Sequence, residues 1–126
     1  MTAENPVTAQ NPMTAQKIAD AYYANFTAKS DFQDVPMSEK LHFQSPMMAL
    51  DGPEAFRGAL TGLLARFQGL DIRHQHASSD TVVTVYDFDL GLPDGPVPMA
   101  EVLTVEHDAL SRVELIFDAK RLAPPA

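Results

Sequence analysis

One acidic residue interrupts an otherwise apolar segment near the C-terminus: Glu101, within Val97–Val105. Its neighbours two positions away are Met99 and Leu103, and because strand side chains alternate between faces, they predict that Glu101 shares their buried face. A buried carboxyl group must find partners or raise its pKa, which would make it an acid at neutral pH. The alternative is an exposed acid on the outer face of a sheet.

Other residues with reactive side chains form no familiar site. His74 and His76 share one face of an expected strand, but catalytic zinc needs three protein ligands and no third has a matching spacing. Cysteine is absent, and the sequence contains neither a nucleophile elbow nor a glycine-rich phosphate loop. We therefore expect no metal and no cofactor.

The composition predicts one folded domain. The chain has 126 residues, is 45% hydrophobic and carries a net charge of −8. This charge argues against binding to nucleic acid or to an anionic membrane surface. No apolar run approaches the roughly 20 residues that span a bilayer, and no signal peptide is visible, so we expect a soluble cytoplasmic protein.

The first half of the chain favours helices. Residues 1–13, which contain most of a tandem six-residue duplication, are expected to be a flexible leader. An amphipathic helix is predicted over 14–29 with Thr14 as its cap, followed by a short second helical element that Val35-Pro36 interrupts. A short strand at 41–44 precedes a helix that begins at Pro53 and ends at Gly69.

From residue 70 the hydrophobic period becomes two, which predicts antiparallel strands over 70–77, 81–90, 99–107 and 110–118. One face of the second strand collects the residues Val82, Thr84, Tyr86, Phe88 and Leu90. Helices followed by such a sheet make an α+β fold over residues 14–122, with a tail at 123–126. The residues expected to be mostly buried are Phe56, Leu60, Leu63, Leu64, Val102, Leu115 and Phe117.

Four local patterns in this order resemble the family of nuclear transport factor 2 (NTF2), ketosteroid isomerase and the SnoaL-like polyketide cyclases. They are the stretch from Tyr23 to Asp31, Phe43-Gln-Ser-Pro46, the Gly-led helix start in 51–56, and Ile116-Phe-Asp118. The resemblance implies a cone-shaped NTF2-like (cystatin-like) fold, in which a curved antiparallel sheet packs on three N-terminal helices. It also implies a homodimer formed through the sheet.

The resemblance assigns catalytic roles to Tyr23, Glu101 and Asp118, and the position of His42 adds a fourth candidate. Tyr23 falls at an oxyanion-hole tyrosine, and Glu101 at an acid that stays protonated to donate a hydrogen bond. Ser45 replaces the general base, so steroid isomerisation by the same mechanism is not expected. His42, on the strand before Ser45, and Asp118, at a position that SnoaL-type cyclases use, are the alternative proton carriers. For each of these residues, a purely packing or surface role is the competing interpretation.

An apolar pocket is the expected centre of function. Ser45, Met47, Met48 and Met99 are predicted to contact a small hydrophobic molecule there. Two classes of function stay open. One is an isomerase, cyclase or dehydratase that stabilises an enolate-like intermediate, and the other is a non-catalytic ligand-binding or dimerisation module.

Overall fold

The computed structural model describes residues 14–122, so the expected leader at 1–13 and tail at 123–126 lie outside the described residues. Two α-helices, six strands and a short 3₁₀ helix follow one another in the order α1 (Ala15–Ala28), β1 (Met37–Gln44), β2 (Ala49–Asp51), α2 (Pro53–Leu64), β3 (Gly69–Ala77), β4 (Thr81–Asp89), β5 (Val97–Glu106), β6 (Ala109–Ile116) and η1 (Ala119–Arg121). The four C-terminal strands agree with the period of two in the sequence. No helix among residues 14–122 is long and apolar enough to cross a membrane.

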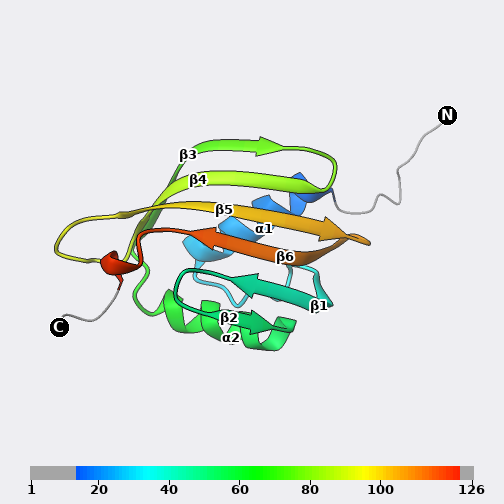
Figure 1. Cartoon of the computed structure of the whole chain (residues 1–126), viewed down its shortest axis with the longest axis horizontal. Helices are drawn as coiled ribbons and strands as arrows, with labels where there is room; N and C mark the ends of the chain where they lie inside the picture. The colour runs from blue at the N-terminus through cyan, green and yellow to red at the C-terminus, as the bar shows by residue number, and fades with distance from the viewer. Residues whose placement is uncertain (1–13, 123–126) are drawn as a thin grey trace.

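The six strands form one curved sheet in the order β2-β1-β6-β5-β4-β3 (Figure 1). The expectation of a wholly antiparallel sheet is corrected at one pair, because β1 runs parallel to β6. Hairpins force antiparallel pairing, but residues 45–108 separate β1 from β6 and no turn constrains their direction. The β2 strand, which the sequence did not indicate, pairs with β1 through His42↔Asp51 to Gln44↔Ala49.

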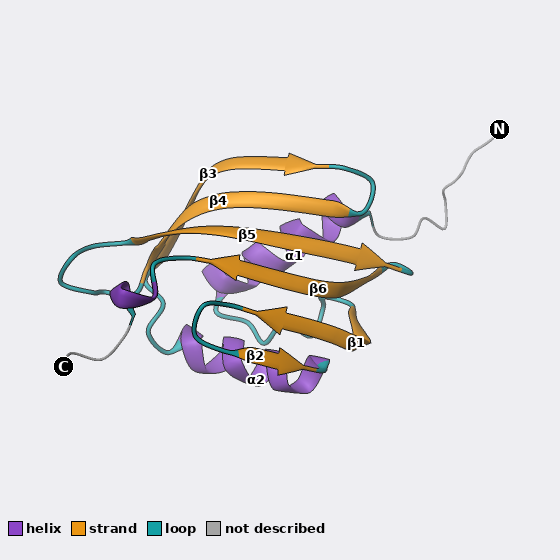
Figure 2. Ribbon diagram, viewed as in Figure 1, coloured by secondary structure: helices purple, strands orange, loops and turns teal. Residues whose placement is uncertain are grey.

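Both α-helices cover the same concave side of the sheet, with α1 against β3, β4 and β5 and α2 against β1 and β2 (Figure 2). The expected third helix is absent from the described part of the chain, where the segment between α1 and β1 consists of bends and turns. Phe32 in this segment has a φ of 64°, a left-handed conformation that a helix cannot accommodate. The buried Asn25 of α1 holds this segment by accepting a hydrogen bond from the Phe32 backbone N–H at 3.0 Å.

The helix ends show which predictions were accurate. Thr14 caps α1 as predicted, because its hydroxyl accepts a hydrogen bond from the Lys17 backbone N–H at 3.2 Å. However, α2 ends at Leu64 and not at Gly69. The chain leaves the helix early so that Phe67 packs between Phe26 and Phe88, with ring centroids 5.8 and 5.3 Å away.

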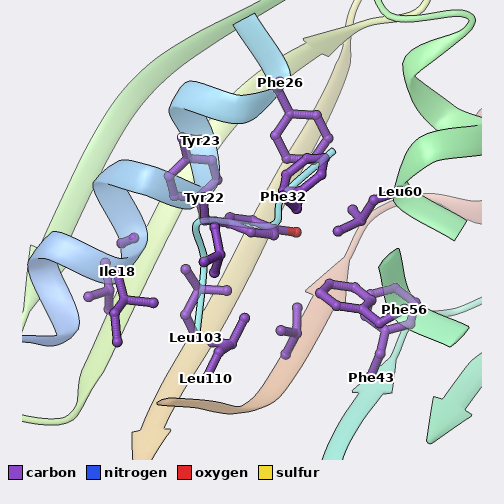
Figure 3. Close-up of a cluster of buried hydrophobic side chains, with 14 of the residues drawn as sticks. Ile18, Tyr22, Tyr23, Phe26, Phe32, Phe43, Phe56, Leu60, Leu103 and Leu110 are labelled. Carbon is purple, nitrogen blue, oxygen red and sulfur yellow. The ribbon is translucent and has the colours of Figure 1, made fainter. Parts of the chain in front are cut away.

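The core lies between the helices and the concave side of the sheet (Figure 3). Of the residues predicted to be mostly buried, Phe56, Leu60 and Leu64 are buried, whereas Leu63, Val102, Leu115 and Phe117 are half-buried. Val102 is half-buried because it points to the convex side, since its neighbours Glu101 and Leu103 are the buried residues of β5. The residues at 82, 84, 86 and 88 form the inward face of β4, since they and Leu90 just beyond the strand are all buried.

Candidate functional site

Glu101 lies at the centre of the core, with only 1% of its surface exposed. It points inward from β5, between the buried residues Met99 and Leu103 on the same face. A carboxyl group in this position has lost nearly all contact with water, so the groups around it decide its chemistry.

Three tyrosine hydroxyl groups surround this carboxyl group. The Tyr22 hydroxyl donates to Oε2 at 2.9 Å, while the hydroxyls of Tyr23 and Tyr86 donate to Oε1 at 3.1 and 2.9 Å. We call Glu101 and these three tyrosines the carboxyl cluster. All four residues are buried, so the hydrogen bonds do not compete with bulk water.

Two elements bring these tyrosines to one carboxyl group. Tyr22 and Tyr23 are consecutive on α1, and their rings meet edge to face with centroids 5.0 Å apart. Tyr86 comes from β4 and pairs with Met99, which places it diagonally across the sheet from Glu101. Aromatic side chains reach across such a diagonal.

Next to the carboxyl cluster is a cavity of about 150 Å³, walled mainly by aromatic and aliphatic side chains. Its lining residues are Tyr22, Phe26, Phe43, Ser45, Met47, Met48, Phe56, Ala59, Leu60, Leu63, Tyr86, Phe88, Met99, Glu101, Leu115, Phe117 and Leu122. Figure 3 shows Tyr22 and Phe26 of α1 facing Phe43, Phe56 and Leu60 across this region. Among residues 14–122, the polar side chains that reach the cavity are those of Ser45, Tyr22, Tyr86 and Glu101, so this wall is apolar with one polar corner.

Burial changes the acid–base behaviour of the carboxyl cluster. Loss of solvation raises the pKa of Glu101 from 4.5 to about 7, although the hydrogen bonds from Tyr22, Tyr86 and Tyr23 oppose this shift. Burial and then the nearby Glu101 charge raise the pKa of each tyrosine above its ordinary value. The tyrosines therefore stay protonated as donors, while Glu101 changes its charge near neutral pH.

The structure brings Tyr23 and Glu101 together but does not place both at the cavity. The Tyr23 hydroxyl contacts Glu101 directly, which leaves no room for a ligand oxygen between the two. Its ring lines a separate shallow groove between α1 and β3, together with Asp20, Leu70 and Ile72. Tyr22, its neighbour in the sequence, is the helix residue that reaches the cavity.

The four predicted ligand-contact residues all lie at the cavity wall. Met99 is buried, whereas Met47 and Met48 are 46% and 49% exposed, so these two mark the mouth of the cavity. Ser45 shapes this mouth, because its Oγ accepts hydrogen bonds from the backbone N–H groups of Met47 and Met48 at 3.1 and 3.2 Å.

The other two predicted proton carriers lie away from the cavity. His42 points to the opposite side of β1 from the buried Leu41 and Phe43, where its Nδ1 lies 2.8 Å from Asp51 Oδ1. Asp118 follows the end of β6, is exposed, and accepts a hydrogen bond from the Lys120 backbone N–H at 3.0 Å. Neither residue contacts the carboxyl cluster.

Sequence reasoning missed Tyr22 and Tyr86 as site residues. The strand alternation placed Tyr86 on one face with Val82 and Phe88, but it did not show that the neighbouring strand would bring Glu101 beside it. For Tyr22, an apolar helix position is equally consistent with simple packing, and only the contact with β5 reveals its partner.

No family model matches the sequence, and no curated protein matches it. Solved structures do match its fold. A protein from Kribbella flavida DSM 17836 is 24% identical with a TM-score of 0.77, and the match covers 86% of this chain and 90% of that one. An NTF2-like protein of unknown function from Cytophaga hutchinsonii is 14% identical with a TM-score of 0.76, covering 92% and 98% of the two chains. A steroid delta-isomerase from Pseudomonas aeruginosa is 16% identical with a TM-score of 0.69, covering 82% and 79%. The chain therefore has the cone-shaped α+β fold of the NTF2-like superfamily.

Proposed function

We propose that this protein binds a small hydrophobic molecule in the cavity beneath α2, with the single polar group of that molecule at the carboxyl cluster. The observation that carries the proposal is the composition of the cavity wall. Among the described residues, this wall is apolar except at Glu101, Tyr22, Tyr86 and Ser45. An apolar wall favours the body of such a ligand, and the few polar groups orient it.

The cavity volume limits the size of this ligand. A dry, apolar protein cavity of about 150 Å³ accommodates benzene, so the cavity of about 150 Å³ fits one six-membered ring. A larger molecule would extend through the mouth at Met47 and Met48, whose unbranched side chains adapt to different shapes. We therefore expect ligands with one ring inside and any further substituent at the mouth.

Filling the cavity tests this proposal. Leu60 is buried on α2 and lines the cavity, so Leu60→Trp should occupy the space of a ring and abolish the binding of ethylbenzene, measured by NMR titration. Thr61→Trp is the matched control, because Thr61 is exposed on the same helix and adds the same side chain outside the cavity. Equal binding by both folded variants would show that ethylbenzene does not occupy this cavity.

A second candidate function is proton transfer on the bound molecule, as in an isomerase, cyclase or dehydratase. The observation that favours it is a fully buried carboxyl group at the cavity wall, because burial raises the pKa of Glu101 to about 7, which suits a general acid or base at neutral pH. Ionised Glu101 would take a proton from a carbon next to the ligand carbonyl and return it to the same carbon of the enolate or, where a double bond is conjugated with the enolate, to the far carbon of that double bond. The enolate oxygen would need a tyrosine proton that now points to Glu101.

Deuterium exchange separates binding from catalysis. If the protein is an enzyme of this kind, it should speed the exchange of the methyl protons of acetophenone in D₂O, and Glu101→Gln should remove this rate while ethylbenzene still binds. If wild type and variant exchange at the same rate as buffer, the passive binding module is the better interpretation.

A further inference from the structure

We infer that the protonation state of the carboxyl cluster decides which polar group of a ligand it binds. With Glu101 ionised, the cluster binds a group that donates a hydrogen bond. With Glu101 protonated, it binds a group that accepts one. This inference rests on the proposed function, because it concerns the polar group of the molecule in that cavity.

The ionised cluster has no proton to offer. Each tyrosine hydroxyl has one proton, and all three are used in the hydrogen bonds to Glu101. Oε1 accepts two of these bonds and Oε2 accepts one, so one acceptor position stays open on Oε2. A hydroxyl group of the ligand satisfies this position, whereas a ligand carbonyl would meet only lone pairs.

Protonation of Glu101 reverses this preference. The cluster then has one proton more than its three internal contacts need, whichever oxygen bears it. Tyr22, Tyr86 and Glu101 all line the cavity, so the surplus donor can turn toward a ligand there. A ligand carbonyl would accept this proton, and without one the donor would stay buried and unsatisfied, which costs free energy.

No other charge near the cluster competes with this effect in the described part of the chain. The residues facing Glu101 or lining the cavity from the packed elements are apolar or neutral, apart from the cluster itself: Phe26 of α1, Thr84 of β4, Met99 and Leu103 of β5, Leu115 of β6, and Phe56 and Leu60 of α2. The hydroxyl of Thr84 is opposite Glu101 in the sheet, accepts a hydrogen bond from Gln75 Nε2 at 3.1 Å and interacts with Tyr23. The Ser45 hydroxyl at the mouth donates to Met48 O at 3.3 Å, so the proton on Glu101 controls the donor count at the carboxyl cluster.

Three probes of one shape test the inference on the wild-type protein. Ethylbenzene has no polar group, acetophenone only accepts a hydrogen bond, and 1-phenylethanol also donates one. At pH 8.5 we expect 1-phenylethanol to bind about tenfold tighter than acetophenone, and at pH 5.5 we expect this advantage to disappear, because the oxygen of either probe can accept the surplus proton. Binding is measured by NMR titration at each pH.

Two further measurements exclude other causes. Bound acetophenone should raise the pKa of Glu101 more than bound 1-phenylethanol does, followed by ¹³C NMR of the Glu101 carboxyl carbon, because linkage is reciprocal and only acetophenone needs the protonated form. In Glu101→Gln the amide keeps a donor at every pH, so the ratio of the two affinities should be the same at both pH values. The ¹³C titration needs no variant and stands if the substitution impairs folding.

The outcomes distinguish the inference from the proposed function. If ethylbenzene binds but the two polar probes keep the same order and ratio from pH 5.5 to 8.5, the inference is overturned and the cavity remains a hydrophobic site. If none of the three probes binds, the proposed function fails and the inference fails with it. A change of this ratio with pH that also appears in Glu101→Gln would assign the effect to another group and overturn the inference.

Discussion

Tyr86 and Glu101 lie diagonally across β4 and β5, and the hydroxyl of the tyrosine donates to Oε1 of the acid at 2.9 Å. Both side chains point to the concave side of the sheet, so the sheet itself holds this half of the carboxyl cluster without help from a helix. The α1 helix then adds Tyr22 and Tyr23. The site is therefore formed only when the helix packs on the sheet.

Stability should fall as the pH rises. The pKa of Glu101 is about 7 in the folded protein and near its ordinary 4.5 when unfolded, so the folded state binds a proton more tightly. The contribution of this proton to the free energy of unfolding is complete below pH 4.5 and is lost as the pH rises through 7. The total loss is roughly 3 kcal/mol. Urea unfolding of wild type and Glu101→Gln from pH 4.5 to 8.5 measures it. Parallel curves for the two proteins would contradict the expectation.

Removal of one tyrosine hydroxyl should raise the pKa of Glu101 further. Tyr22→Phe deletes the donor to Oε2, and because a hydrogen bond to a charged group stabilises it, we expect a rise of about one pKa unit. ¹³C NMR of the Glu101 carboxyl carbon measures the titration. Phe56→Leu is the control, since Phe56 stacks on Tyr22 but donates nothing. The same rise in both variants would point to general disturbance of the core.

Asn25→Ala should destabilise the protein by about 2 kcal/mol. The Asn25 amide accepts from the Phe32 backbone N–H and donates to Ala21 O and Asp34 Oδ1, both at 2.7 Å, so its removal leaves the left-handed turn at Phe32 unsupported. Thermal unfolding of Asn25→Ala is compared with that of Thr27→Ala, an exposed site on the same helix. Equal melting temperatures of the two variants would show that the turn at Phe32 does not depend on Asn25.

We propose that two copies of the chain pair through the convex face of the sheet. Ile116 and Val83 are 52% and 38% exposed there, and the half-buried Val85, Ala100 and Val102 lie between them. Ile116→Lys should convert a dimer to a monomer in light scattering at micromolar concentration. Ile72→Lys is the control, because Ile72 is also exposed but lines the groove on the concave side. A monomeric wild-type protein would refute the pairing.

The sequence predicted what depends on local pattern. The period of two placed Glu101 between Met99 and Leu103, and the same rule applied to Leu41 and Phe43 would have placed His42 on the opposite side from the cavity. The end of α2 depends instead on a tertiary contact, because Phe67 packs against Phe26 and Phe88, which are distant in the sequence. The role of Tyr22 was hidden for the same reason, since its partner lies 79 positions away.

The pairing of Tyr22 and Tyr23 with one carboxyl group also fixes the orientation of α1. Consecutive helix residues project about 100° apart, so both reach Glu101 only when the helix has one rotation about its own axis and one position along it. Apolar contacts alone tolerate rotation and sliding by neighbouring residues, whereas these two bonds do not. Glu101 thus fixes the rotation and the position of α1 on the sheet. A variant with an apolar residue at position 101 would allow several orientations of α1 in place of a single one.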